Sequence, residues 1–110
     1  MSTPIPEVIG RYFEADARRD VDAIVALFAE DAAVVDEGQT RRGTAEIRAW
    51  QEGAASQYQY TTEIFDTRAA GDDRFLVTGR LKGNFPGGIA NLNWHFTVAG
   101  DRIHALEIAP

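Results

Sequence analysis

The sequence predicts an α+β fold in which three N-terminal helices pack on a strongly curved, mostly antiparallel sheet. In the first half of the chain, apolar residues recur at the spacing of amphipathic helices, and from Tyr58 onward they alternate with a period of two. Turn sequences such as Gly71-Asp72-Asp73 separate the alternating segments, as in a meander of antiparallel strands. Because a long twisted sheet curls around its helices, we expect a cone whose apolar interior can hold a small molecule.

The composition fits a single domain, residues 1–110, with a sizeable core. A net charge of −6 makes a nucleic acid or an anionic membrane a poor partner. The sequence has no cysteine, which excludes disulfides and thiolate chemistry and fits a reducing cytoplasm. The longest apolar run, Ala23–Ala29, is too short to span a bilayer, and the N-terminal MSTPIPEV lacks the basic-then-apolar pattern of a signal peptide. We therefore predict a cytoplasmic location.

The first helix is predicted to start near Thr3-Pro4 and Pro6-Glu7, because proline suits the first turn of a helix. Its inner face is expected to comprise Val8, Ile9, Tyr12, Phe13 and Ala15. Gly10 lies inside this helix, where glycine costs about 1 kcal/mol relative to alanine. We interpret Gly10 as a position of close packing.

The stretch Asp20–Gly43 organises the rest of the chain. Asp20 is a good N-cap residue for a second helix, since its carboxylate can accept hydrogen bonds from the first free N–H groups. An apolar stripe at helical spacing follows, formed by Val21, Ile24, Val25 and Phe28. We expect this helix to end at Glu30-Asp31 and a strand to follow over Ala32–Asp36.

This strand ends at a carboxylate that shares a face with an apolar residue. Val34 and Asp36 lie two positions apart, so if Val34 faces the core, Asp36 does too. Glu37-Gly38 is typical of a turn, and Gln39–Arg42 is predicted to return as the second strand of a hairpin. A carboxylate on the inner face of a strand is the observation on which the functional prediction depends.

A third helix is predicted over Ala45–Ser56, with Thr44 as its N-cap residue and with Ile47 and Trp50 as its main apolar contacts. The strands that follow show three alternating series: Tyr58, Tyr60, Thr62 and Ile64; Phe75, Val77, Gly79, Leu81, Gly83 and Phe85; Ala90, Leu92, Trp94, Phe96 and Val98. The last strand is predicted over Ile103–Ile108.

Tyr12, the stretch Asp20–Gly43 and the C-terminal segment FTVAGDRIHALEI together resemble the nuclear-transport-factor-2-like superfamily, and within it the SnoaL-like and ketosteroid-isomerase-like branch. The resemblance covers nearly the whole chain and is strongest in GRYFEADARRDVDAIVALFAEDAAVVDEGQTRRGTAEIRAW. It implies a cone-shaped fold of three helices and a strongly curved sheet. It also implies a homodimer formed through the outer face of the sheet.

In the isomerase branch, the residue matching Asp36 is the general base, and the residue matching Tyr12 donates a hydrogen bond to the enolate oxygen. Proton removal next to a carbonyl needs both a base over the carbon and a donor at the oxygen. The isomerase also carries a second, protonated acid, whose place here falls on Asn93 or Trp94. We favour Trp94 as the inward residue, because its neighbours in the alternation are apolar. Loss of one oxyanion donor costs roughly 10²–10³-fold in rate, which argues against steroid isomerisation.

The resemblance and the alternation predict seven ligand-binding residues: Trp50, Tyr58, Tyr60, Phe75, Trp94, Phe96 and Leu106. His95 falls on the polar face of its strand. His104 alternates with Leu106 and Ile108, so we expect it at the rim or buried and hydrogen-bonded, rather than catalytic. Two isolated histidines give no metal-binding spacing, and neither a metal nor another cofactor is predicted.

The leading hypothesis is an enzyme in which Asp36 and Tyr12 act on a small apolar carbonyl compound by isomerisation, aldol-type cyclisation or dehydration. The alternative is a non-catalytic ligand-binding or dimerisation module of the same fold, favoured by the missing second acid and the bulky Trp94. Asp36 could equally accept backbone hydrogen bonds in its turn, and Tyr12 could be a core tyrosine. An epoxide hydrolase or a histidine-dependent dehydratase would need a His–Asp pair or an Asp–Arg–Asp set inside the cone, and His95 points the wrong way by strand parity.

Overall fold

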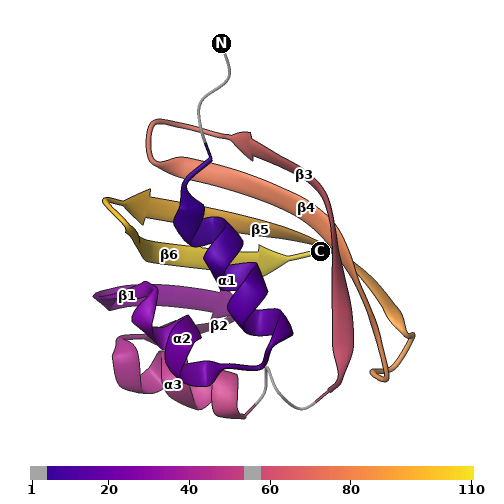
Figure 1. Cartoon of the computed structure of the whole chain (residues 1–110). Coiled ribbons are helices and arrows are strands. Elements are labelled where there is room, and N and C mark those ends of the chain that lie inside the picture. Colours follow the sequence, from indigo (N-terminus) through magenta and orange to yellow (C-terminus); the bar gives the residue numbers. More distant parts are fainter. Residues whose placement is uncertain (1–4, 54–57) are drawn as a thin grey trace.

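The computed structural model describes residues 5–53 and 58–110. Within these residues, three helices lie on the concave side of one six-stranded, strongly curved sheet that does not close into a barrel (Figure 1). In chain order the elements are α1 (Glu7–Ala17), α2 (Val21–Ala26), β1 (Phe28–Asp36), β2 (Gln39–Arg42), α3 (Thr44–Glu52), β3 (Tyr60–Ala69), β4 (Arg74–Gly83), β5 (Ile89–Ala99) and β6 (Arg102–Ala109). The strand order is β2-β1-β6-β5-β4-β3, antiparallel except where β1 meets β6. The predicted α+β cone is confirmed.

Helix α1 buries one apolar face and ends in a Schellman motif. Val8, Ile9 and Tyr12 are buried, as the helical spacing predicted. At the C-terminus the Arg19 N–H donates to the Asp16 carbonyl and the Asp20 N–H donates to the Ala15 carbonyl. Arg19 has a φ of 56°, so this turn holds a non-glycine residue in the left-handed region. Of the predicted start signals, Thr3-Pro4 lies outside the described residues.

The interpretation of Gly10 as a close-packing position is wrong. Gly10 lies on the exposed side of α1, and a Cβ atom built there would meet no atom within 4 Å. A larger residue would fit at this position, so no close contact offsets the cost of glycine in the helix.

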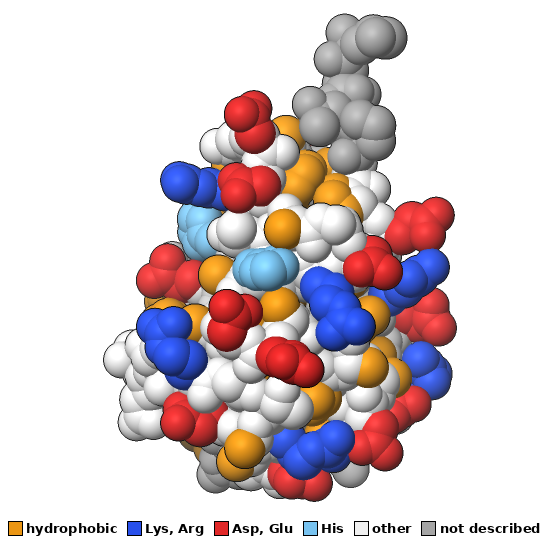
Figure 2. Space-filling model, turned by 90° about the vertical axis from the view of Figure 1, so that its left-hand side faces the viewer, with side chains coloured by type: hydrophobic (Ala, Val, Ile, Leu, Met, Phe, Trp, Pro, Cys, Tyr) orange, Lys and Arg blue, Asp and Glu red, His pale blue; other side chains and the backbone are white. Residues whose placement is uncertain are grey.

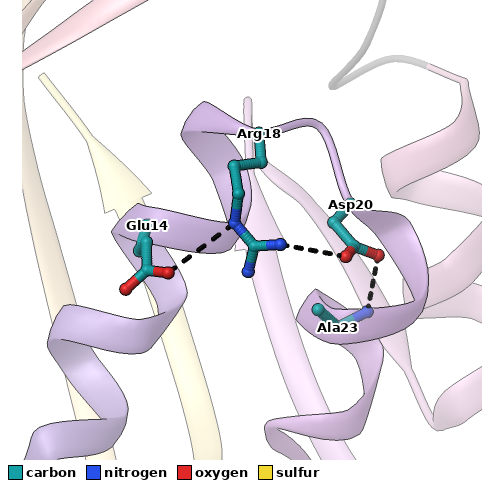
Figure 3. Close-up of polar contacts among 4 residues, drawn as sticks. All are labelled: Glu14, Arg18, Asp20 and Ala23. Carbon is teal, nitrogen blue, oxygen red and sulfur yellow. Dashed lines mark hydrogen bonds and ion pairs between the residues drawn. The ribbon is translucent and has the colours of Figure 1, made fainter.

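Helix α2 begins at the predicted N-cap. The Asp20 carboxylate accepts a hydrogen bond from the Ala23 N–H at 3.1 Å, and it also pairs with Arg18 at 3.3 Å (Figure 3). Arg18 in turn pairs with Glu14 one turn back on α1, at 3.7 Å. These contacts join the end of α1 to the start of α2.

The second helix is shorter than predicted, and its expected end at Glu30-Asp31 is wrong. Helix α2 stops at Ala26 and β1 already begins at Phe28. The Ile103 N–H of β6 donates to the Leu27 carbonyl at 2.8 Å, and Phe28 pairs with Ile103 in the sheet. Because pairing with β6 satisfies this backbone, it overrides the helical preference read from the apolar spacing.

Helix α3 begins at Thr44, with Gly43 in the N-cap position, so the predicted capping role of Thr44 is wrong. Gly43 has a φ of 87°, which favours glycine, and its N–H donates to the Ala32 carbonyl at 2.8 Å. Ile47 and Trp50 are buried, as predicted. The described helix ends at Glu52, and the predicted end at Ser56 lies outside the described residues.

A row of paired residues crosses the sheet at the level where β1 ends. Asp36 pairs with Ile108, Ile108 pairs with Trp94, and Trp94 pairs with Val77. Residues paired in this way project from the same face of a sheet. Asp36 and Trp94 therefore both lie on the inner face, as the strand parity predicted.

The expected rim or buried position of His104 is not observed. A bulge between Thr97 and Val98 shifts the β5–β6 register, so that Ile103 and Leu106 are both buried and His104 is exposed. His95 is exposed as predicted. In Figure 2 the histidine side chains lie at the surface among interspersed acidic and basic side chains.

One end of the cone is filled with aromatic side chains. The Tyr12 ring meets the rings of Phe13, Phe28 and Phe96 edge-on, with centroids 5.2, 6.2 and 5.5 Å away. Such pairs stabilise a core beyond the area that they bury.

In the described part of the chain, no helix has the length and apolarity needed to cross a membrane.

Candidate functional site

The other end of the cone contains a cavity of about 700 Å³. It lies between α1, α3 and the turn after β1 on one side and the ends of the strands on the other. Its apolar lining includes Leu81, Phe85, Leu92, Trp94 and Ile108. Its polar lining includes Tyr12, Asp16, Asp36, Gln51 and Tyr60. The interior is therefore open to a small molecule and is not packed shut by aromatic side chains.

Asp36 reaches the cavity from the last position of β1. Its Oδ2 atom accepts a hydrogen bond from Trp50 Nε1 at 3.0 Å, and its backbone carbonyl accepts one from Arg41 at 3.3 Å. Trp50 is 3% exposed, so its indole is fixed by packing in α3. The carboxylate is thus held in one orientation at the cavity wall, by β1, which carries it, and by α3, which follows the β1–β2 hairpin and carries Trp50.

Tyr12 reaches the same cavity from α1. Burial raises the pKa of the Tyr12 phenol well above its usual value, and the negative charges of Asp16 and Asp36 and the neighbouring Tyr60 raise it further. The phenol therefore stays protonated at neutral pH and is a hydrogen-bond donor. Tyr12 and Asp36, the two predicted residues, both line this cavity.

A second carboxyl group, Asp16, lies one helical turn after Tyr12. Both of its oxygens are 3.1 Å from the Tyr60 hydroxyl, which donates to them from β3. Burial raises the pKa of Asp16, although the Tyr60 hydrogen bond and the Arg19 charge oppose the rise. Burial and the Asp16 charge raise the pKa of Tyr60 to about 12.

Arg19 covers the outer side of this pair. Its guanidinium carbon lies 4.0 Å from the centre of the Tyr60 ring, and its Nη2 donates to the Tyr58 carbonyl at 3.1 Å. A cation over an aromatic face is attracted to it. The Schellman turn at the end of α1 therefore positions Tyr60 as well as ending the helix.

A family model described as a SnoaL-like domain matches residues 9–105. The chain belongs to the SnoaL-like family. The predicted membership is thereby confirmed. No curated protein matches the chain in sequence.

Solved structures carry the same SnoaL-like fold. A candidate polyketide cyclase from Sinorhizobium meliloti is 36% identical, with 96% of this chain and 95% of that chain covered and a TM-score of 0.88. A Catenulispora acidiphila protein with a ketosteroid isomerase-like fold, in complex with trimethylamine, is 20% identical, with 97% and 87% covered and a TM-score of 0.84. A Mycobacterium tuberculosis protein in complex with estradiol-17β-hemisuccinate is 14% identical, with 94% and 91% covered and a TM-score of 0.80. The last two similarities concern the fold.

The structure separates the seven predicted ligand-binding residues of this SnoaL-like domain into two groups. Four of them line the cavity, namely Trp50, Tyr58, Tyr60 and Trp94. The other three lie in the core and away from the cavity wall, namely Phe75, Phe96 and Leu106. The two groups differ in their position along the strands, between the packed end and the cavity end. Strand alternation predicts which face of the sheet a residue lies on, but not its distance from the packed end.

Sequence reasoning missed two polar residues of the wall. Asp16 and Gln51 are the buried polar or charged residues among those described, 8% and 4% exposed, and both line the cavity. The Gln51 amide nitrogen has no hydrogen-bond partner in the described part of the chain. The spacing of Tyr12 and Asp16, four residues apart on one helix, could have revealed Asp16. Gln51 follows Trp50 and carries no comparable signal.

The arrangement can move protons. It combines a fixed carboxylate, a protonated phenol and a buried carboxyl group around a largely apolar space, which suits general acid–base chemistry on a neutral ligand. His95 and His104 are exposed and do not line the cavity. Across the described residues, no three or more His, Asp or Glu side chains gather in a way that could hold a metal ion.

Proposed function

We propose that this SnoaL-like domain is an enzyme that removes a proton next to the carbonyl group of a small apolar compound. The observation that supports the proposal is the pairing of Asp36, held by Trp50, with the protonated Tyr12 in one cavity of about 700 Å³. A base and an oxyanion donor facing one apolar space are the two groups that enolate chemistry requires.

In this mechanism Asp36 takes the proton from the carbon next to the carbonyl. The electron pair of the broken C–H bond moves toward the carbonyl oxygen, where negative charge develops. Tyr12 donates a hydrogen bond to that oxygen and stabilises the charge, because a fixed donor in a water-poor site needs no reorganisation. The Trp50 hydrogen bond keeps the base oriented between turnovers.

Of the three reaction types open to such a site, we favour aldol-type cyclisation. The support is the 36% identity, over nearly the whole length, to the candidate polyketide cyclase. The cavity wall supplies apolar surface from Leu81, Leu92, Trp94 and Ile108, which suits a ligand with a hydrophobic body. Proton transfer of this kind needs no redox cofactor.

The test uses α-hydrogen exchange, which does not require the natural substrate. Wild-type protein should catalyse exchange of the α-hydrogens of 2-tetralone in D₂O, followed by proton NMR. Asp36→Asn should lower the rate by about 10²–10⁴-fold, the usual contribution of a general base. Binding of 2-naphthol, an enolate mimic, should persist. The matched control is Asp31→Asn, an exposed carboxylate of the same strand.

Equal exchange rates in wild type and Asp36→Asn would contradict the proposal. Binding of 2-naphthol without any exchange would instead favour the second candidate, a non-catalytic ligand-binding module. That candidate is favoured by Trp94, a bulky and non-acidic side chain, on the inner face of β5 in the row that contains Asp36.

We also propose a homodimer formed through the outer face of the sheet. Phe65 is 56% exposed, and the Arg80 guanidinium of the outer face lies 5.2 Å from its ring. An exposed aromatic ring beside a cation is a suitable anchor for an interface. Sedimentation equilibrium should show a dimer for wild type and a shift toward monomer for Phe65→Glu, and a wild-type monomer would contradict this assembly.

A further inference from the structure

The Asp16 carboxyl group is buried in the cavity wall and is not used by the proposed base and oxyanion donor. It is 8% exposed, and its two oxygens are equidistant from the Tyr60 hydroxyl at 3.1 Å. Burying a carboxyl group is costly unless the group is neutral or well paired. Arg19, whose charge acts on Asp16, is engaged with the Tyr60 ring and the Tyr58 carbonyl. The site therefore lacks a direct ion pair that would hold Asp16 as a carboxylate.

Two neighbouring groups influence Asp16, namely Tyr60, which lines the same cavity, and Arg19, which does not. The Tyr60 hydroxyl and the Arg19 charge favour the carboxylate, whereas burial favours the neutral acid and is the strongest of the three effects. Tyr12 lies one turn away on α1, and the Asp16 charge raises the pKa of Tyr12 more than the Asp36 charge does. Tyr12 thus shares the cavity wall with a carboxyl group from its own helix and with another from β1.

We propose that Asp16 is a second catalytic residue of this cavity, a neutral carboxylic acid that gives its proton to a substrate oxygen while Asp36 acts as the base. The proposal rests on the proposed function. It supplies from helix α1 the acid that neither Asn93 nor Trp94 provides on β5.

The proton and electron balance of an aldol-type ring closure illustrates the role. Asp36 takes a proton from the α-carbon, and the electron pair of that C–H bond forms the new C–C bond to a second carbonyl carbon of the same molecule. The π electrons of that second carbonyl move to its oxygen, which takes the proton from Asp16. The product is a neutral β-hydroxy ketone. Asp36 is then protonated and Asp16 ionised, with Tyr60 donating to the new carboxylate, and solvent returns the proton from Asp36 to Asp16.

A purely structural role for Asp16 predicts a different response to substitution. Asparagine at position 16 keeps the size of the side chain and an oxygen that can accept from Tyr60, so a structural contact would survive the change. It cannot supply a proton. The Asp16→Asn variant therefore separates the two roles, and Glu14→Gln, an exposed residue of the same helix, is the matched control.

The first measurement is the pH dependence of 2-tetralone exchange. In this reaction Asp36 removes the α-hydrogen, and Asp16 gives its proton to the single carbonyl oxygen, so that the neutral enol forms. In wild type and Glu14→Gln, the rate should fall as pH rises through the ionisation of Asp16. Asp16→Asn should be slower by roughly 10²-fold and should lack this fall. Tyr60→Phe should move the fall to higher pH, because the Tyr60 hydrogen bond stabilises the carboxylate. A rate and pH profile in Asp16→Asn equal to those of Glu14→Gln would overturn the proposal.

A second measurement keeps the inference testable if the proposed function fails. Affinity for 2-naphthol should drop roughly tenfold or more as Asp16 ionises, since a neutral acid can donate to the naphthol oxygen and a carboxylate cannot. Asp16→Asn should show no such drop, and carbon-13 NMR of the carboxyl groups should find Asp16 titrating above its ordinary range. Absence of exchange in wild type would remove only the proposed function. A pH-independent affinity in wild type would remove the role of Asp16.

Discussion

The two ends of the cone are built from the same strands but bury different chemistry. At the packed end, Phe96 and Ile103 are 1% and 0% exposed and belong to the hydrophobic core cluster. At the cavity end the same inner face continues into Trp94, Ile108 and Asp36. There the helices add polar side chains instead of apolar ones. The face of the sheet is continuous, so the difference between the ends comes from what the helices place opposite it.

This difference concentrates the energetic cost of polar burial at one place. A buried polar group costs free energy unless it is hydrogen-bonded. Asp16 and Gln51, the buried polar residues of the described chain, both lie at the cavity end, and the Gln51 amide nitrogen has no partner there. The polar groups whose burial opposes folding therefore lie where a ligand could use them, which is the physical reason to place the chemistry at this end.

The largest expected effect is a difference in how much a substitution at each end of the cone lowers the free energy of unfolding. Phe96→Ala should lower the free energy of unfolding by about 3–5 kcal/mol, because the packed end cannot collapse around the lost ring. Leu92→Ala, at the half-buried cavity wall, should cost clearly less, since the space beside it is already open. Urea unfolding followed by circular dichroism measures both. Equal losses would mean that the cavity end is packed as tightly as the core.

A substitution at the boundary should disturb both ends. Gly79 lies on β4, where a Cβ atom would collide with the Glu63 carbonyl oxygen and approach the Trp94 ring to 3.3 Å. Gly79→Ala should therefore destabilise the protein by about 1–3 kcal/mol, as overpacking usually does. It should also slow 2-tetralone exchange by displacing Trp94. Unfolding free energy and exchange rate measured on the same sample check this, and an unchanged unfolding free energy would contradict the close approach.

The buried acid predicts the sign of a pH effect on stability. Because burial raises the pKa of Asp16 above 3.8, the folded state binds more protons than the unfolded state between 3.8 and the raised value. The free energy of unfolding should therefore fall through this window as pH rises, by an amount that Asp16→Asn removes. Urea unfolding at a series of pH values, with Glu14→Gln as control, measures it. A difference between wild type and Asp16→Asn that is independent of pH would contradict the neutral acid.

The Tyr60 phenol gives a spectroscopic view of the same pair. Its pKa is raised to about 12, by burial first and then by the Asp16 charge. In wild type, the ultraviolet absorbance of the phenolates should show one tyrosine that titrates near this value. That tyrosine should be missing in Tyr60→Phe. In Asp16→Asn the same tyrosine should ionise at lower pH, because the negative charge beside it is gone. An unchanged Tyr60 titration in that variant would show that the carboxylate does not act on the phenol.

Much of the fold could be predicted because periodicity reports which face of an element is buried. The spacing of Val8, Ile9 and Tyr12 and the alternation through Trp94 and Phe96 identified buried faces correctly. Element boundaries depended on partners distant in sequence. The end of α2 was missed because Ile103, about 75 residues later, pairs with Phe28. The orientation of His104 was missed because a bulge changes the register without any glycine or proline to mark it.

The site was predictable only where a residue pattern carried chemistry. Asp36 stood out as a carboxylate on an apolar face, and Tyr12 stood out through the family resemblance. The spacing of Asp16 from Tyr12 places both on one face of the helix, but an aspartate among charged residues near a helix end reads as exposed. Its burial depends on Tyr60, 44 residues away, closing over it from β3. Depth along the cone was not predictable either, which is why Phe75 was expected beside the ligand and lies in the core.

The smallest expected effect should leave both ends unchanged. Gly10 lies on the exposed side of α1, the helix whose other face carries Tyr12 and Asp16, and a Cβ atom there meets nothing within 4 Å. Gly10→Ala should stabilise the protein by about 0.5–1 kcal/mol, because alanine loses less backbone entropy in a helix. Exchange rate and 2-naphthol affinity should stay at wild-type values. A loss of activity with the gain in stability would show that the site needs a flexible α1, and the difference between the two ends would then lie in motion as well as in packing.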